Sequence, residues 1–130
     1  MLRPTISTPL NAVTATTTSS AVNTENANKI TCLFTRANHS SGSSAFSVLG
    51  SVDGTTFEAI MLVKIIASDA GAGTAGEDIG YTRALSATLG ADGSENWGVD
   101  IKHTCFKEIK VKVTETTDGT HTAKVLIERN

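Results

Sequence analysis

The residues best suited to metal binding or redox chemistry are three histidines and two cysteines, and they are scattered along the sequence. Cys32 and Cys105 lie too far apart to match a zinc-binding motif. His103 and Cys105 stand two positions apart and would share one face of a strand, which leaves a Cys/His site as a minor alternative. Because no second ligand pair accompanies them, we predict no metal and no other cofactor. We favour two buried free thiols over a disulfide between them.

Side chains used in hydrolytic catalysis lack the arrangement that such chemistry needs. The sequence has no G-x-S-x-G motif, and His39 and His121 fall at predicted loop tips. The glycine-rich stretch GAGTAG, residues 71–76, is not followed by the Lys-Ser/Thr pair of a phosphate-binding loop. Carboxylates for a glycosidase-like pair are few, and most adjoin predicted turns: Glu58, Asp69, Glu77, Asp78 and Asp100. We predict that the chain is not an enzyme.

Composition and charge disfavour nucleic acid as a partner. The chain has 130 residues, enough for one domain, with a net charge of −2 and only 5% aromatic residues for base stacking. One cluster of lysines is present, in which Lys110 and Lys112 project from one predicted strand as a possible surface patch. Such outward charges more commonly keep a sheet soluble. The N-terminal sequence lacks an apolar segment for export or membrane insertion, so we expect synthesis in the host cytoplasm and no membrane contact.

Alternation of apolar and polar residues predicts strands from residue 29 onward. Ile30, Cys32 and Phe34 share one face of the first strand. The stretch FSVLGSVDGTTF, residues 46–57, predicts a strand, a turn and a returning strand that pairs with it. The apolar residues of this stretch that we expect in the core are Phe46, Val48, Val52 and Phe57. The continuation EAIMLVKIIA predicts a strand buried on both faces.

The remaining segments extend this pattern. Residues 68–80 predict a long loop and residues 81–90 a short strand, and then Trp97, Val99 and Ile101 alternate inward. Residues 106–130 predict a closing hairpin with these inward residues: Ile109, Val111, Val113, Ala123, Val125 and Ile127. Turns are expected at three dipeptides, and calcium is not expected at the first of them: Asp53-Gly54, Asp92-Gly93 and Asp118-Gly119. The fold class is therefore all-β, an antiparallel β-sandwich of jelly-roll or immunoglobulin-like form.

Residues 1–28 have a different character, with two prolines, many Thr and Asn residues and little periodicity. They predict an extended N-terminal arm in front of a sandwich domain at residues 29–130. The arm must lie on its own domain or on a neighbouring subunit, since ordering it is costly. We expect removal of residues 2–20 to leave the domain folded and to abolish its attachment to particles. The candidate partner-binding residues in the arm are Leu2, Arg3, Pro4, Ile6, Pro9, Leu10 and Val13.

The F-x-V-x-G-S-x-D-G-x-x-F pattern of residues 46–57 and the I-x-V-x-V-T pattern of residues 109–114 resemble small β-sandwich structural proteins of tailed-phage virions. Head decoration, or cement, proteins are the nearest type. The resemblance implies a mechanical function on the capsid surface, with the major capsid protein or another virion protein as partner. It also implies a homo-oligomer, with a trimer favoured. The alternative is a glycan-binding or adhesion module of a tail or fibre, for which Trp97 and Tyr81 are the only candidate sugar platforms.

Overall fold

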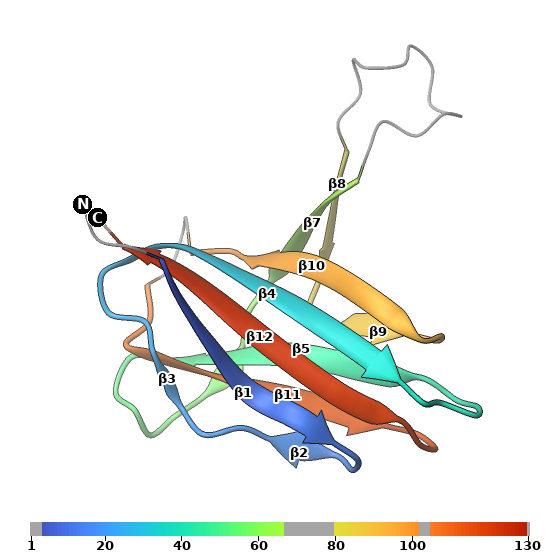
Figure 1. Ribbon diagram of the computed structural model, residues 1–130. Coiled ribbons are helices and arrows are strands. Elements are labelled where there is room, and N and C mark those ends of the chain that lie inside the picture. The colour runs from blue at the N-terminus through green and yellow to red at the C-terminus, as the bar shows by residue number, and fades with distance from the viewer. Residues whose placement is uncertain (1–3, 67–79, 102–104, 130) are drawn as a thin grey trace.

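The computed structural model describes residues 4–66, 80–101 and 105–129. Two antiparallel sheets pack face to face as a sandwich, which confirms the predicted fold class (Figure 1). Within these residues no helix is long and apolar enough to cross a membrane.

The first sheet, sheet A, has six strands. In spatial order they are β1 (Thr5–Val13), β12 (Thr120–Arg129), β4 (Ala27–Ala37), β10 (Gly93–Val99), β7 (Leu62–Ile66) and β8 (Gly80–Ala84). The second sheet, sheet B, runs in the order β2 (Thr17–Thr18), β11 (Glu108–Glu115), β5 (Ser44–Ser51) and β6 (Glu58–Ala59). Two short strands complete it: β3 (Val22–Asn23) pairs with β11, and β9 (Ala87–Leu89) pairs with β5.

The core lies between the sheets and is built from the alternating residues of each strand. The rings of Phe34 on β4 and Phe46 on β5 stack across the layer with centroids 4.8 Å apart. The inward residues expected on the last two strands are all buried, and so are Trp97 and Val99. Period-two alternation therefore identified the inward face of these strands correctly.

The predicted closing hairpin is wrong in its pairing. Strand β11 pairs with β5 in sheet B, whereas β12 pairs with β4 and β1 in sheet A. The Asp118-Gly119 turn therefore carries the chain from one sheet to the other. Alternation shows that a strand has one buried face, but it does not show which sheet holds its hydrogen-bonded neighbours.

The predicted N-terminal arm is also wrong, because residues 5–23 contribute strands to both sheets. Strand β1 forms an edge of sheet A, and β2 and β3 pair with β11 in sheet B. Register shifts between Ser7 and Leu10 and between Leu10 and Val13 interrupt β1. These irregularities break the alternation by which a strand is recognised in a sequence.

The segment after β5 differs from the prediction as well. Strand β6 pairs with β5 over only two residue pairs, and the chain then crosses to β7 in sheet A. Val52 is 73% exposed and Phe57 is half-buried. The prediction that both residues lie in the core is therefore wrong. Leu62 is buried but Met61 is exposed, so this stretch is not buried on both faces. Residues 81–90 form two strands, β8 and β9, in different sheets.

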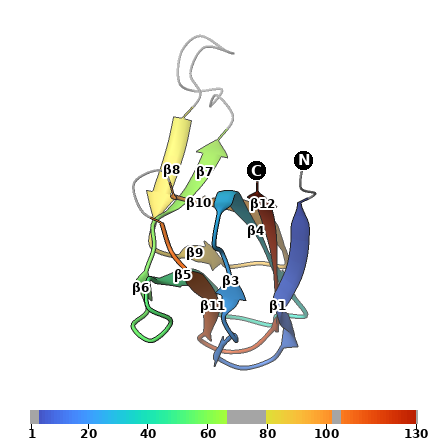
Figure 2. The ribbon, with the colours of Figure 1, turned by 90° about the vertical axis from the view of Figure 1, so that its left-hand side faces the viewer.

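Strands β7 and β8 extend away from the body of the sandwich (Figures 1 and 2). Their ladder runs regularly from Leu62 opposite Ala84 to Ile66 opposite Gly80. Strand β10 pairs with β7 only at Leu62 and Val63, so the part of β7 beyond Val63 has β8 as its neighbour on one side alone. At the base of this hairpin, Lys64 lies 3.6 Å from Glu95, which also accepts a hydrogen bond from Trp97 Nε1 at 3.0 Å.

Candidate functional site

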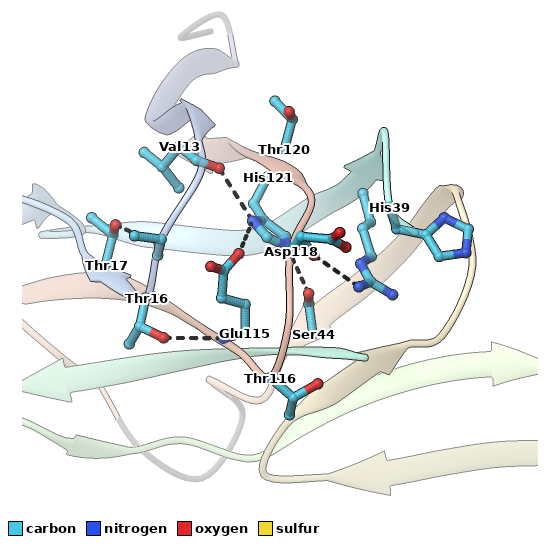
Figure 3. Close-up of polar contacts among 12 residues, drawn as sticks. Val13, Thr16, Thr17, His39, Ser44, Glu115, Thr116, Asp118, Thr120 and His121 are labelled. Atoms are coloured by element: carbon cyan, nitrogen blue, oxygen red, sulfur yellow. Dashed lines mark hydrogen bonds and ion pairs between the residues drawn. The ribbon is translucent and has the colours of Figure 1, made fainter. Parts of the chain in front are cut away.

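A buried polar network joins the two sheets at one end of the sandwich (Figure 3). Its central members are Arg36 on β4, Ser44 on β5, Glu115 on β11 and His121 on β12. The side chains of Arg36, Ser44 and His121 are at most 1% exposed. A hydroxyl, an imidazole and a carboxylate therefore meet at this end of the sandwich.

His121 lies at the centre of the network. Its Nε2 is 2.6 Å from Ser44 Oγ, and its Nδ1 is 3.1 Å from the Val13 carbonyl oxygen and 3.7 Å from Glu115 Oε2. A neutral ring with the proton on Nδ1 donates to the Val13 carbonyl and accepts from the Ser44 hydroxyl, which satisfies both nitrogens. His121 thereby connects β1 and β12 of sheet A to β5 of sheet B.

In space, His121 lies between Ser44 and Glu115, as the base of a catalytic triad lies between its serine and its acid. A working triad needs its hydroxyl open to a substrate, yet Ser44 and His121 are both fully buried. His121 Nδ1 is also closer to the Val13 carbonyl oxygen than to the Glu115 carboxylate. In the described arrangement Ser44 and His121 join strands across the sandwich by hydrogen bonds, whereas Glu115 Oε2 lies buried without a hydrogen-bond partner.

Arg36 ties two loops and the end of β9 to the same end of the molecule. Its guanidinium donates to the carbonyls of Ser41 at 2.9 Å, Gly42 at 3.0 Å and Asp118 at 2.9 Å, and to that of Leu89 at 3.2 Å. Buried arginine is tolerated only when its donors are satisfied, and these four bonds meet most of that need.

Gly119 makes room for this packing. Its φ is +128°, and a side-chain carbon there would lie 3.1 Å from Arg36 Nε and 3.2 Å from His121 Nε2. Glycine therefore meets both the backbone geometry and the close approach of two side chains.

The carboxylates of the three Asp-Gly dipeptides are engaged by nearby loops. Thr56 N–H, then Thr55 N–H and the Ser51 hydroxyl, lower the pKa of Asp53 to about 2. The His39 side chain and N–H lower the pKa of Asp92, with His39 Nδ1 2.5 Å from its Oδ1. The hydroxyl and N–H of Ser40 lower the pKa of Asp118. Asp53 shapes its own turn, and the other two acids anchor the loop after β4.

The network was only partly visible in the sequence. His121 was expected at a loop tip, but it is buried on β12. The signal that could have found it is its phase, because His121 alternates with the inward residues Ala123, Val125 and Ile127. His39 does lie in a loop, between β4 and β5.

The candidate partner-binding residues do not form one surface. Leu2 and Arg3 lie outside the described residues, and Leu10 is a core residue at 1% exposure. Pro4 and Ile6 are exposed, whereas Pro9 and Val13 are partly buried. The lysines of the possible patch, Lys110 and Lys112, are half-buried on the outer face of β11, with Lys110 Nζ 4.4 Å from the centre of the Phe57 ring.

The remaining candidates for chemistry are separate from one another. Cys32 is a buried free thiol as expected, and burial raises its pKa to about 12. Cys105 is free but exposed, which corrects the expectation that both would be buried. His103 lies outside the described residues, among which no three His, Cys, Asp or Glu side chains could hold a metal together. Trp97 is 6% exposed and belongs to the core, which leaves little of its ring free for a sugar. The side chain of Tyr81 lies outside what the structure describes.

No protein-family model matches the chain, and neither does any curated protein. One solved structure is similar, the crystal structure of SPBc2 prophage-derived protein YomS, with a TM-score of 0.60. The alignment covers 98% of this chain and 97% of that chain at 11% sequence identity. At this identity the likeness extends to the fold alone. The chain therefore has the β-sandwich fold of a prophage-derived protein.

Proposed function

We propose that the chain is a non-enzymatic structural protein of a phage virion, and that it decorates the head by binding the major capsid protein. The likeness to a prophage-derived protein along nearly the whole chain carries this proposal. The patterns of residues 46–57 and 109–114, which resemble those of head decoration proteins, support the same class.

The side of the molecule that bears the β7–β8 hairpin is the best candidate for the contact with the shell. Figure 2 shows β6, β7 and β8 on the side opposite β1. Among the residues whose burial the structure describes, five large apolar ones are exposed, and three of them lie in connections on this side: Val52 before β6, Met61 before β7 and Leu85 after β8. We call this the hairpin side. Exposed apolar residues that gather on one side commonly mark a protein contact.

A groove on the hairpin side adds to this surface. It has a volume of about 460 Å³ and is lined in part by Val52, Ile60, Met61 and Phe106. The opposite edge of sheet A also has exposed large apolar residues, Ile6 and Leu126, which are register partners on β1 and β12. An apolar side chain of a shell protein would fill the groove. Ile6, by contrast, does not line this groove.

A repeated shell makes a modest contact of this kind effective. When many copies bind a regular lattice, contacts between neighbouring copies raise the apparent affinity by orders of magnitude without new chemistry. The closed, fully buried Ser44–His121 pair is consistent with this mechanical role, because it holds the sandwich together and offers no open hydroxyl.

A binding assay on purified particles tests the proposal. Heads that lack the chain, from the phage or prophage that encodes it, are mixed with the purified protein and separated by sedimentation. We expect saturable binding of the wild-type chain to heads. The Val52→Asp variant should bind at least about tenfold more weakly, since a buried unpaired carboxylate is costly in an apolar contact.

Ile6→Asp provides the matched control, because Ile6 is 70% exposed and Val52 is 73% exposed. It should bind heads as the wild type does. Binding to tails alone would contradict the decoration role and place the chain elsewhere in the virion. Absence of binding to any particle would reject the virion proposal.

A further inference from the structure

The two outer edges of sheet A differ in how open they are to another strand. The β1 edge is interrupted by two register shifts, by Pro9, which has no N–H group, and by Ala12 with a φ of +55°. Bulges and prolines are common devices that stop an edge strand from pairing with another chain. The β1 edge is therefore protected.

The β8 edge has none of these devices. Gly80–Ala84 contains no proline and pairs with β7 in a ladder without a register shift. In the part of the chain that the structure describes, no strand pairs with the outer side of β8. Beyond Val63 the hairpin is a ribbon of two strands, and such ribbons are marginally stable in water without a third strand.

The sequence of β8 suits pairing with itself. When two copies align antiparallel with Thr82 opposite Thr82, Tyr81 stands opposite Arg83 and Gly80 stands opposite Ala84. Threonine pairs are favourable across strands, and this alignment places no two charged residues opposite each other. An alignment centred on Arg83 would instead place two like charges opposite each other, which is unfavourable.

We propose that β8 of one copy pairs antiparallel with β8 of a second copy, centred on Thr82, so that the two A sheets become one continuous sheet. Such a contact uses the same surface on both subunits and closes as a two-fold dimer. A dimer differs from the trimer that the family resemblance implies. The proposal goes beyond the virion function and does not depend on it, because copies can pair in solution without a capsid.

Cysteine cross-linking of the full chain tests this register. Directly opposite residues of antiparallel strands have Cα atoms about 4.5 to 5.5 Å apart, within the range that a disulfide spans. We therefore expect Thr82→Cys, in a Cys105→Ser background, to form a covalent dimer under mild oxidation. Cys32 stays unreactive because it is buried, and its pKa is raised to about 12.

Thr88→Cys in the same background is the control, since Thr88 is also an exposed threonine on a short strand. Thr82→Cys should cross-link at least about tenfold faster, because pairing raises the effective concentration of the two thiols. Equal rates for the two variants would overturn the proposal. So would sedimentation of the Cys105→Ser protein as a monomer at all concentrations, or as a trimer.

A charge at the centre of the contact gives a second test. Thr82→Lys should shift the protein to monomer, because the two lysines would face each other, whereas Thr82→Val should remain dimeric. Circular dichroism confirms that both variants are folded. A dimeric Thr82→Lys protein would contradict the pairing. Binding of the monomeric Thr82→Lys protein to heads tests the virion proposal independently of the dimer.

Discussion

At the scale of single residues, buried polar groups link the two sheets of this sandwich. Arg36, Ser44 and His121 lie where an ordinary sandwich would place apolar side chains, and their hydrogen bonds reach strands of both sheets and the loops beyond them. Alternation alone could have predicted that position 121 is inward. It could not have predicted the partners, because Val13 and Ser44 are distant in sequence and meet only after both sheets form.

Ser44→Ala should destabilise the protein by about 1–3 kcal/mol. The change leaves His121 Nε2 buried without its hydrogen-bond donor, and an unsatisfied buried polar group costs about this much. The measurement is the free energy of unfolding in urea. Ser47→Ala on the outer face of the same strand should change it by less than about 0.5 kcal/mol. Equal losses in the two variants would contradict the role of the network.

Acid should destabilise the protein in part through Asp53. Its pKa falls from 3.8 to about 2 on folding, so the stabilisation is present above the unfolded value and is lost as the pH falls through the folded value. The melting temperature of the wild type should therefore drop between about pH 4 and pH 2. Asp53→Asn should flatten that drop, because the titrating group is gone. Parallel curves for the two proteins would show that the Asp53 carboxylate is not held as described.

At the scale of strands, the sequence predicts inward faces well and partners poorly. The inward residues of β11 and β12 were identified correctly, but the two strands belong to different sheets. Alternation does not reveal strand β1, because register shifts and Pro9 interrupt it, and Leu10 is therefore predicted to lie in an arm. Sheet membership depends on contacts between distant segments, which local alternation does not encode.

Leu10→Ala should cost about 2–5 kcal/mol, because Leu10 is 1% exposed and its side chain fills the core beneath β1. An N-terminal arm outside the domain would predict almost no loss. Ile6→Ala, on the same strand but 70% exposed, should change stability by less than about 0.5 kcal/mol. Urea unfolding measures both variants. If Leu10→Ala is as stable as the wild type, the result would contradict the packing of β1 and support an extended N-terminal arm. Deletion of residues 2–20 would then leave the domain folded.

At the scale of the whole molecule, the fold class followed from composition and alternation, whereas the functional surface did not. The sandwich places protected and open edges on opposite sides of sheet A, and the open side also holds Val52, Met61 and Leu85. Alternation predicts Val52 in the core, and the composition of residues 1–28 predicts a partner-binding arm there. The sequence could not predict that the hairpin projects from the sandwich, because this depends on where β10 stops pairing with β7.

The amount of the chain in purified virions is the direct test of the decoration role. Particles of the phage or prophage that encodes it are purified on a gradient, and mass spectrometry measures the ratio of the chain to the major capsid protein. We expect a constant ratio across the particle peak, with many copies per head, and we expect no chain in tail-only fractions. A chain that separates from particles, or that remains only with tails, would contradict it.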